Sequence, residues 1–232
     1  MTGLAPHRHV HDVAAGWAGM RTGVIHRTGW TMLSGCPIAA EHTPRRAYGV
    51  DLRSPGEAAA DPVECLPPET LLLPVDVAGV AARLTGTPSA AEYTALNLDT
   101  LHGCGDAIAG LVTVVLARLP RPVVLGCSLG KDRTGLVVAL LLTLAGADDD
   151  EICAQDRLAR SSILACPTAV DRYAARRGVS TEELARRCAV DDSPLRTALH
   201  TLRTDYGGAA AYLEVHGAPA GLLGLARVAL RR

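Results

Sequence analysis

Short apolar runs bounded by turn residues predict the strands of this chain. One run surrounds Val24, and a second covers residues 49–52 before an Arg-Ser-Pro-Gly turn. A third starts with "ETLLLP" and is expected to end at residues 74–76, while "RPVVLG" is the most continuous of the four. Apolar runs of this length, flanked by Gly and Pro, are typical of buried strands.

Apolar residues at helical spacing predict helices between and after these strands. Residues 89–119 follow this spacing, with Gly103 and Gly105 weakening the middle of the segment. The run "TGLVVALLLTLAG" predicts a buried helix that ends at Gly146. From residue 148 onward the sequence is predominantly helical in character.

Strands that alternate with helices, followed by a helical tail, predict an α/β fold with a largely parallel central sheet. The 232 residues fit one domain, and no internal repeat or linker divides them. We therefore expect residues 1–232 to form a single domain, with residues 148–232 as a mainly helical part packed on it. That helical part and residues 77–96 are both candidates for a lid over a binding site.

Composition excludes several classes of protein. Hydrophobic residues make up 48% of the chain and its net charge is -1, so it can bury a core but has no basic excess for binding a nucleic-acid polymer. Seven cysteines occur without any Cys-x-x-Cys pair, which argues against zinc sites and a disulfide framework and indicates a reducing compartment. Without an apolar leader or a run long enough to span a bilayer, we expect a cytoplasmic protein without stable membrane insertion.

The junction between the predicted strand "RPVVLG" and the buried helix contains residues that could bind a ligand or take part in a reaction. A glycine-containing loop that enters a helix presents backbone N–H groups and the positive end of the helix dipole to an anion. A nucleotide-binding P-loop does not fit, because Leu125 stands where its first glycine belongs and Asp132 stands where Ser or Thr should hold magnesium.

The segment "CSLGKDRTG" instead has Cys127 followed by five residues and then Arg133 and Thr134. Five intervening residues let the chain curl around a tetrahedral dianion, with the Cys127 sulfur below the phosphorus and the planar guanidinium of Arg133 on two oxygens. The inward N–H groups also favour the thiolate. Thr134 is expected to donate a hydrogen bond to the leaving sulfur. The predicted phosphate-binding residues are Ser128, Leu129, Gly130, Lys131, Asp132 and Arg133.

This loop closely resembles that of the atypical bacterial tyrosine-phosphatase family, whose pattern is His-Cys-x-x-Gly-Lys-Asp-Arg-Thr-Gly. Weaker similarities extend over most of the chain: "HVHDVAAG" near the start, "VDLRSPGEA" at residues 50–58, "LLLPVD" ending at Asp76, and "YGGAAAYL" at residues 206–213. Members of the family are protein-tyrosine and phosphoinositide phosphatases. The resemblance implies a cysteine-phosphatase-like fold and a phosphomonoester hydrolase that requires neither metal nor cofactor.

Within this resemblance, Cys127 is the nucleophile that forms a phosphocysteine, and Arg133 stabilises the transition state. Lys131 either adds positive charge at the rim of the loop or is a solvated surface lysine. The leaving oxygen needs a proton donor opposite the thiolate. Asp132 and Asp76 are both candidates for this general acid, with Asp132 preferred. Asp51 is expected to be structural.

The chain departs from the family pattern at several positions. Gly126 stands where the family has a His that orders the loop and tunes the thiolate, so its absence predicts a looser loop or a higher cysteine pKa. Arg157 replaces a tyrosine, and Arg157 and Arg160 are interpreted either as solvated helix residues or as anion contacts.

The substrate class follows from the composition of the chain. Because aromatic residues make up only 3% of it, a small phosphorylated sugar, nucleoside or inositol is favoured over a phosphotyrosyl protein as substrate. A phosphate-binding pseudophosphatase is a further alternative. His7, His9 and His11 alternate near the N-terminus, but no companion ligands suggest a metal site.

Overall fold

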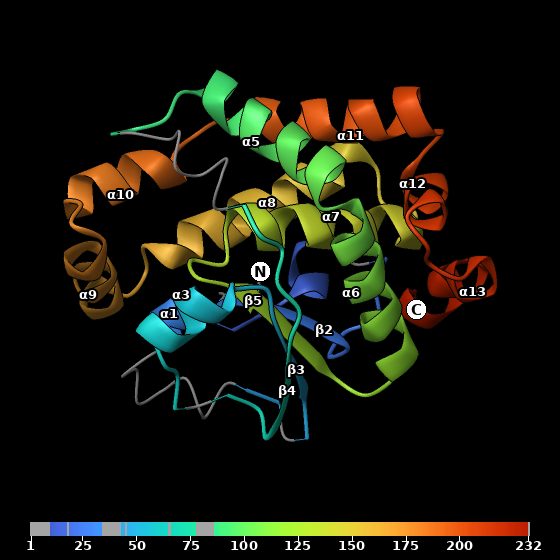
Figure 1. Cartoon of the computed structure of the whole chain (residues 1–232), viewed down its shortest axis with the longest axis horizontal. Helices are drawn as coiled ribbons and strands as arrows, with labels where there is room; N and C mark the ends of the chain where they lie inside the picture. The colour runs from blue at the N-terminus through green and yellow to red at the C-terminus, as the bar shows by residue number, and fades with distance from the viewer. Residues whose placement is uncertain are drawn as a thin grey trace.

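The computed structural model describes residues 10–17, 19–33, 43–44, 46–64, 66–77 and 86–231. Its five strands form one sheet in the order β1-β2-β5-β3-β4 (Figure 1). β2, β5, β3 and β4 are parallel to one another, and β1 at the edge runs antiparallel to β2. The strands are β1 His11–Asp12, β2 Ile25–Gly29, β3 Tyr48–Asp51, β4 Glu69–Leu72 and β5 Val123–Cys127. The predicted α/β fold with a mostly parallel sheet is confirmed.

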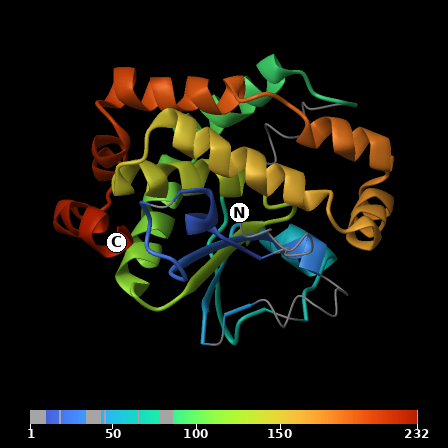
Figure 2. The ribbon, with the colours of Figure 1, turned by 180° about the vertical axis from the view of Figure 1, so that it is seen from behind.

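Helices cover the sheet and continue to the C-terminus (Figures 1 and 2). The first part of the chain contains η1 Val13–Gly16, α1 Trp30–Leu33, α3 Pro55–Ala60, α5 Ala90–Gly103, α6 Gly105–Arg118 and α7 Asp132–Ala145. The helical tail contains α8 Asp149–Ile163, α9 Pro167–Arg177, α10 Thr181–Cys188, α11 Ser193–Tyr206, α12 Ala209–Val215 and α13 Ala220–Leu230.

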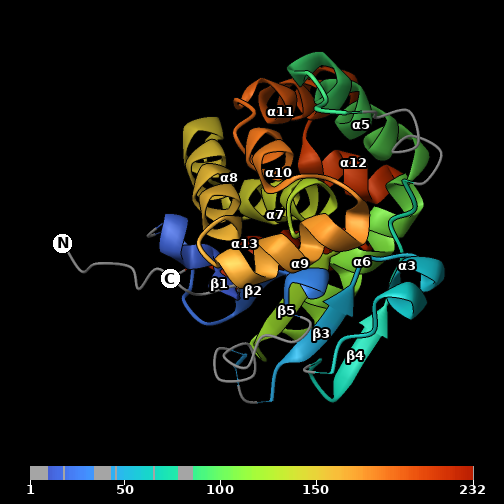
Figure 3. The same ribbon diagram turned by 90° about the vertical axis from the view of Figure 1, so that its left-hand side faces the viewer.

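The two faces of the central strand β5 pack against different parts of the chain. Val123 and Leu125 belong to the main core, which α6, α7, α11, α12 and α13 share, whereas Val124 packs with Trp30 and Leu33 of α1. Figure 3 shows most of the helices stacked on one side of the sheet. The alternation follows the period of two of a strand and explains why β5 is apolar throughout.

Helix α7 is the buried helix predicted after the loop. Its residues from Thr134 to Leu142 are all buried, as expected of a helix that is hydrophobic on every side. Gly146 ends it in a left-handed conformation with a φ of 92°, so the predicted end of this helix is correct. The helix thereby fixes the loop before it to the core of the protein.

Some boundaries differ from those predicted. The Arg-Ser-Pro-Gly turn is the start of α3, where Ser54 and Glu57 form a capping box. β4 ends at Leu72, before Pro74, which cannot donate a hydrogen bond to a neighbouring strand. The segment at residues 89–119 is two helices that break at Cys104.

Among the described residues, no single helix is long and apolar enough to cross a membrane. The consecutive helices α5 and α6 reach that length and composition only when taken together, and they are bent by 79° at their junction.

Candidate active site

Cys127 lies at the end of the central strand, at the carboxyl edge of the parallel sheet. The parallel register places it level with Gly29 of β2, and places Gly126 level with Asp51 of β3. Ligands of open α/β sheets bind at this edge. The chain then passes through residues 128–131 into α7, which begins at Asp132. The loop predicted from sequence is therefore a strand–loop–helix junction.

The loop packs directly on the backbone of β2, with glycines at the points of closest approach. Gly130 has a φ of 76°, and a Cβ built on it would lie 2.5 Å from the Thr28 carbonyl oxygen. A Cβ on Gly126 would lie 2.4 Å from the same oxygen. The space that a side chain at residue 126 would need is thus filled by the main chain of β2. Whether the loop is looser without a His at this position stays a prediction.

Two hydroxyl groups hold the ends of the loop. The Thr134 Oγ1 accepts a hydrogen bond of 2.9 Å from the Cys127 N–H. The Ser128 Oγ lies 2.9 Å from the Thr31 Oγ1 and accepts a hydrogen bond of 2.6 Å from Arg177 of α9. Thr134 therefore fixes the backbone of Cys127, while its expected bond to the sulfur stays a prediction.

Arg133 is held by a carboxylate that the sequence analysis missed. Its Nη1 and Nη2 each donate a hydrogen bond of 2.7 Å to Glu57 of α3, and Nη1 also reaches the Leu52 carbonyl at 3.2 Å. Burial alone would raise the pKa of Glu57, but the hydrogen bonds and charge of Arg133 lower it to about 2. The Ser-x-x-Glu spacing of Ser54 and Glu57 marks a helix start, and only the fold brings this carboxylate to Arg133.

Lys131 is buried, which excludes the interpretation as a solvated surface lysine. Its Nζ lies 2.7 Å from Asp132 and 3.6 Å from the centre of the Tyr93 ring, and the side chain is only 4% exposed. Burial opposes the charge, but Asp132 and Tyr93 raise the pKa of Lys131 overall. Lys131 is therefore a fixed cation between an aromatic ring and a carboxylate.

The loop forms one wall of a cavity of about 300 Å³. Six loop or adjoining residues line it: Cys127, Ser128, Leu129, Lys131, Asp132 and Arg133. The other walls come mainly from α5, α9 and α10, through residues that include Tyr93, Leu96, Asn97, Tyr173, Arg177, Leu184 and Arg187. The chain thus brings two of its five tyrosines to the cavity. The low aromatic content of the chain therefore does not leave the cavity without aromatic rings.

The two candidate acids are placed differently. Asp132 lines the cavity beside Cys127 and Arg133. Asp76 is exposed, is not among the described residues that line the cavity, and accepts a hydrogen bond of 3.3 Å from the Cys104 thiol through its backbone carbonyl. The geometry therefore favours Asp132.

Asp51 binds Arg53 through both carboxylate oxygens, and both side chains are buried. This pairing agrees with the structural role expected for Asp51.

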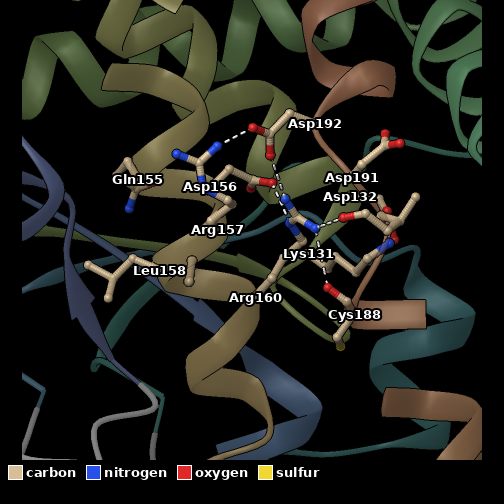
Figure 4. A network of polar contacts seen from close by, with 12 residues as sticks. Lys131, Asp132, Gln155, Asp156, Arg157, Leu158, Arg160, Cys188, Asp191 and Asp192 are labelled. Carbon is tan, nitrogen blue, oxygen red and sulfur yellow. Dashed lines mark hydrogen bonds and ion pairs between the residues drawn. The ribbon is translucent and has the colours of Figure 1, made fainter. Parts of the chain in front are cut away.

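Arg160 has neither of the roles considered for it from sequence. It is 6% exposed and binds Asp156, Asp192 and the carbonyl groups of Cys188 and Val190 (Figure 4). Arg157 is half exposed and forms an ion pair with Asp192.

These arginines join α8 to the segment between α10 and α11. Neither residue is among those that line the 300 Å³ cavity in the described part of the chain.

Within the ranges that the structure describes, no group of three or more His, Cys, Asp or Glu residues is arranged to hold a metal ion. His11 lies in β1. His7 and His9 are outside the described residues, as are residues 78–85 of the candidate lid at residues 77–96. The helical candidate lid contributes α9 and α10 to the cavity wall, and its movement stays a prediction.

Two comparisons with known proteins match this chain. The sequence profile of the tyrosine phosphatase family matches residues 21–222. The triple specificity protein phosphatase PtpB of Mycobacterium tuberculosis (strain ATCC 25618 / H37Rv) is 45% identical over 58 residues. This alignment covers 25% of the present chain and 20% of PtpB.

We predict that Glu57→Gln destabilises the protein in a pH-dependent way. Gln keeps the capping-box geometry of α3 but removes the charge that faces Arg133. Because the folded pKa of about 2 lies below the ordinary value of 4.5, the ion pair contributes fully above pH 4.5 and is lost as pH falls toward 2. Urea unfolding should show a loss on the order of 2 kcal/mol at neutral pH that shrinks on acidification.

Glu92→Gln is the matched control. Glu92 occupies the same capping-box position in α5, where the hydrogen bonds that it forms within the described residues go to Ser89 and not to an arginine. Its substitution should change stability by only a few tenths of a kcal/mol. A stability difference for Glu57→Gln that stays constant between neutral pH and about pH 3 would contradict the assignment of the ion pair.

Proposed function

The chain belongs to the tyrosine phosphatase family, and from this we propose that it hydrolyses phosphomonoesters through a phosphocysteine on Cys127. The observation that carries the proposal is the shared cavity. Cys127, Arg133 and Asp132 line the same 300 Å³ space, so a nucleophile, a bidentate cation and a carboxylate can reach one phosphate group.

In the proposed first step, the Cys127 thiolate attacks phosphorus. The sulfur–phosphorus bond forms as the bond to the ester oxygen breaks, and the leaving oxygen takes its proton from Asp132, the proposed general acid. The N-terminus of α7 and the loop N–H groups favour the thiolate, and Arg133 binds two equatorial oxygens. Among the described residues, none accepts a hydrogen bond from the Arg133 Nε–H, which supports a role for that edge of the guanidinium in binding phosphate.

In the second step, water attacks the phosphocysteine. Asp132 accepts its proton, the sulfur–phosphorus bond breaks, and inorganic phosphate leaves with the thiolate regenerated. The thiolate supplies the nucleophile, and Arg133, Lys131 and the loop N–H groups supply the positive charge. We therefore propose that the reaction needs no metal ion.

For the substrate we propose a small polar phosphomonoester, such as a sugar, nucleoside or inositol phosphate. Two aromatic rings line the cavity, but Lys131 covers Tyr93 at 3.6 Å and the Arg177 guanidinium lies 5.6 Å from the centre of the Tyr173 ring. Cations beside both rings favour hydroxyl-rich or anionic groups over a second aromatic ring.

A phosphotyrosyl protein is the second candidate. Leu96, Leu184 and Val179 provide apolar surface in the same cavity, and the partial relative PtpB is described as a protein phosphatase. These observations favour an aromatic leaving group.

We predict that Cys127→Ser abolishes the hydrolysis of p-nitrophenyl phosphate, because a serine hydroxyl is not ionised at neutral pH. EDTA should leave wild-type turnover unchanged. The absorbance of released p-nitrophenolate measures the turnover of the variant and of the wild-type protein with EDTA. Turnover retained in Cys127→Ser, or lost with EDTA and restored by a metal ion, would overturn the mechanism. A wild-type protein that binds phosphate without turnover would instead be the pseudophosphatase.

We predict that Asp132→Asn slows the release of poor leaving groups most. The variant should lose about 100-fold in kcat for phenyl phosphate but much less for p-nitrophenyl phosphate, whose leaving group needs less protonation. Asp76→Asn serves as the comparison and should retain wild-type rates with both esters. The reverse pattern in the two variants would identify Asp76 as the acid.

A panel of phosphomonoesters tests the substrate class. We expect kcat/KM for at least one sugar, nucleoside or inositol phosphate to exceed that for phosphotyrosyl peptides, because cations flank both tyrosine rings. Phosphate release measured with malachite green gives each value. Phosphotyrosyl peptides that outcompete every small molecule would replace this class with the second candidate.

A further inference from the structure

A buried arginine of the sheet contacts the back of the loop. Arg27 in β2 is 1% exposed, and its Nη2 donates to the carbonyl oxygens of Gly130 at 2.8 Å and Lys131 at 3.4 Å. Arg27 does not line the cavity on the other side of the loop, in the part of the chain that the structure describes. It therefore contacts the loop from outside the binding site.

The charge of Arg27 is balanced from a separate element. Asp156 of α8 accepts hydrogen bonds from Nη1 at 3.1 Å and Nη2 at 3.2 Å, and Gln155 accepts one from Nη1 at 2.9 Å. A guanidinium buried this deeply requires such partners. Because α8 neutralises Arg27, the arginine does not compete for an anion in the cavity.

Every hydrogen bond that the described residues donate to a loop carbonyl comes from outside the cavity. The Ser128 carbonyl accepts from the Thr31 N–H at 3.1 Å, and the Lys131 carbonyl also accepts from the Gly135 N–H at 2.7 Å. No described protein group accepts a hydrogen bond from the N–H groups of residues 128–132. A peptide unit whose carbonyl is fixed outward directs its N–H to the opposite side.

From these contacts we propose that Arg27 is a positioning residue for the phosphatase reaction. It fixes the Gly130 and Lys131 carbonyls outward, so that the peptide N–H groups that follow them face the anion and the Cys127 thiolate. The inference rests on the proposed function. In this proposal the loop is supported by Arg27 and not by residue 126, which precedes the nucleophile.

The packing around Gly126 supports the proposal that Arg27, and not the residue before the nucleophile, positions the loop. A Cβ on Gly29 would lie 2.5 Å from the Leu129 carbonyl carbon, and Cβ atoms on Gly126 and Gly130 would meet Thr28. The loop and β2 therefore lie in backbone contact along residues 28–29, directly after Arg27. In the family pattern a His precedes the nucleophile; here Arg27 reaches the loop from the neighbouring strand.

Arg160 offers a matched control. It binds the other oxygen of Asp156 at 2.9 Å and is 6% exposed, so it resembles Arg27 in burial and in its partner. Its remaining bonds go to Cys188, Val190 and Asp192, away from the carbonyl groups of the loop (Figure 4). A general loss of packing around Asp156 should affect both arginine variants equally.

The experiment compares Arg27→Met, Arg27→Lys and Arg160→Met in the full chain. Iodoacetamide labelling over a range of pH, with the modified peptide identified by mass spectrometry, gives the pKa of the Cys127 thiol. Calorimetry with inorganic phosphate gives the affinity of the loop for an anion. Neither measurement requires turnover. Thermal unfolding shows whether each variant is folded at the temperature of these measurements.

In Arg27→Met we expect the thiol pKa to rise by about one unit and phosphate to bind about tenfold more weakly. Turnover of p-nitrophenyl phosphate should fall about 10- to 100-fold. Arg27→Lys keeps the charge but not the fork, so it should fall between Met and wild type, and it replaces Arg27→Met if that variant does not fold. Arg160→Met should keep the wild-type thiol pKa and phosphate affinity.

Unchanged labelling and phosphate binding in a folded Arg27 variant would overturn the proposal. An equal change in Arg160→Met would also overturn it, because the effect would then come from general loosening. If wild-type protein shows no turnover but its thiol still responds to Arg27→Met, the positioning role stands and the proposed hydrolysis fails.

Discussion

The site depends on the parallel pairing of β5 with β2 on one side and β3 on the other. This register brings Gly29, Asp51 and Cys127 to neighbouring strand ends, with Arg27 level with Leu125, although these residues are distant in sequence. The buried helix α7 holds the other end of the loop in the core. With both ends fixed, the backbone between them has little freedom, and the donors of the anion site are organised before a ligand arrives.

Among the described residues, four cations (Lys131, Arg133, Arg177 and Arg187) and two carboxylates (Glu57 and Asp132) line the cavity, so a chain of net charge -1 can offer an excess of positive charge at this site. Arg133, Lys131 and Arg27 are each paired with a carboxylate: Glu57, Asp132 and Asp156, respectively. Each pair satisfies a buried charge and fixes the direction of the cation. The net charge of the chain is therefore a poor guide to the ligands of this fold, because the two charges of each such pair cancel in the sum.

The sequence was sufficient to predict the central strand, the buried helix and the loop between them, because each has a local signal. Apolar runs marked β5 and α7, and the spacing from Cys127 to Arg133 marked the loop. Contacts made through the fold could not be predicted this way. Glu57 belongs to a short capped helix, and Tyr93 and Arg177 lie on helices far along the chain, so no local pattern relates them to Cys127. Arg27 could not be predicted this way either, because it stands between the polar residues His26 and Thr28 in the sequence and only the fold buries it.

The backbone contact at Gly126 also constrains how the chain can change over evolutionary time. A side chain at this position would need space now filled by the carbonyl of Thr28, which belongs to the sheet and cannot move alone. A His before the nucleophile would thus require a coordinated change in β2. Introduced alone, a side chain here would displace backbone against which the loop packs. The glycine and the strand beside it are therefore coupled, because a larger residue at one is compatible with the fold only together with a change in the other.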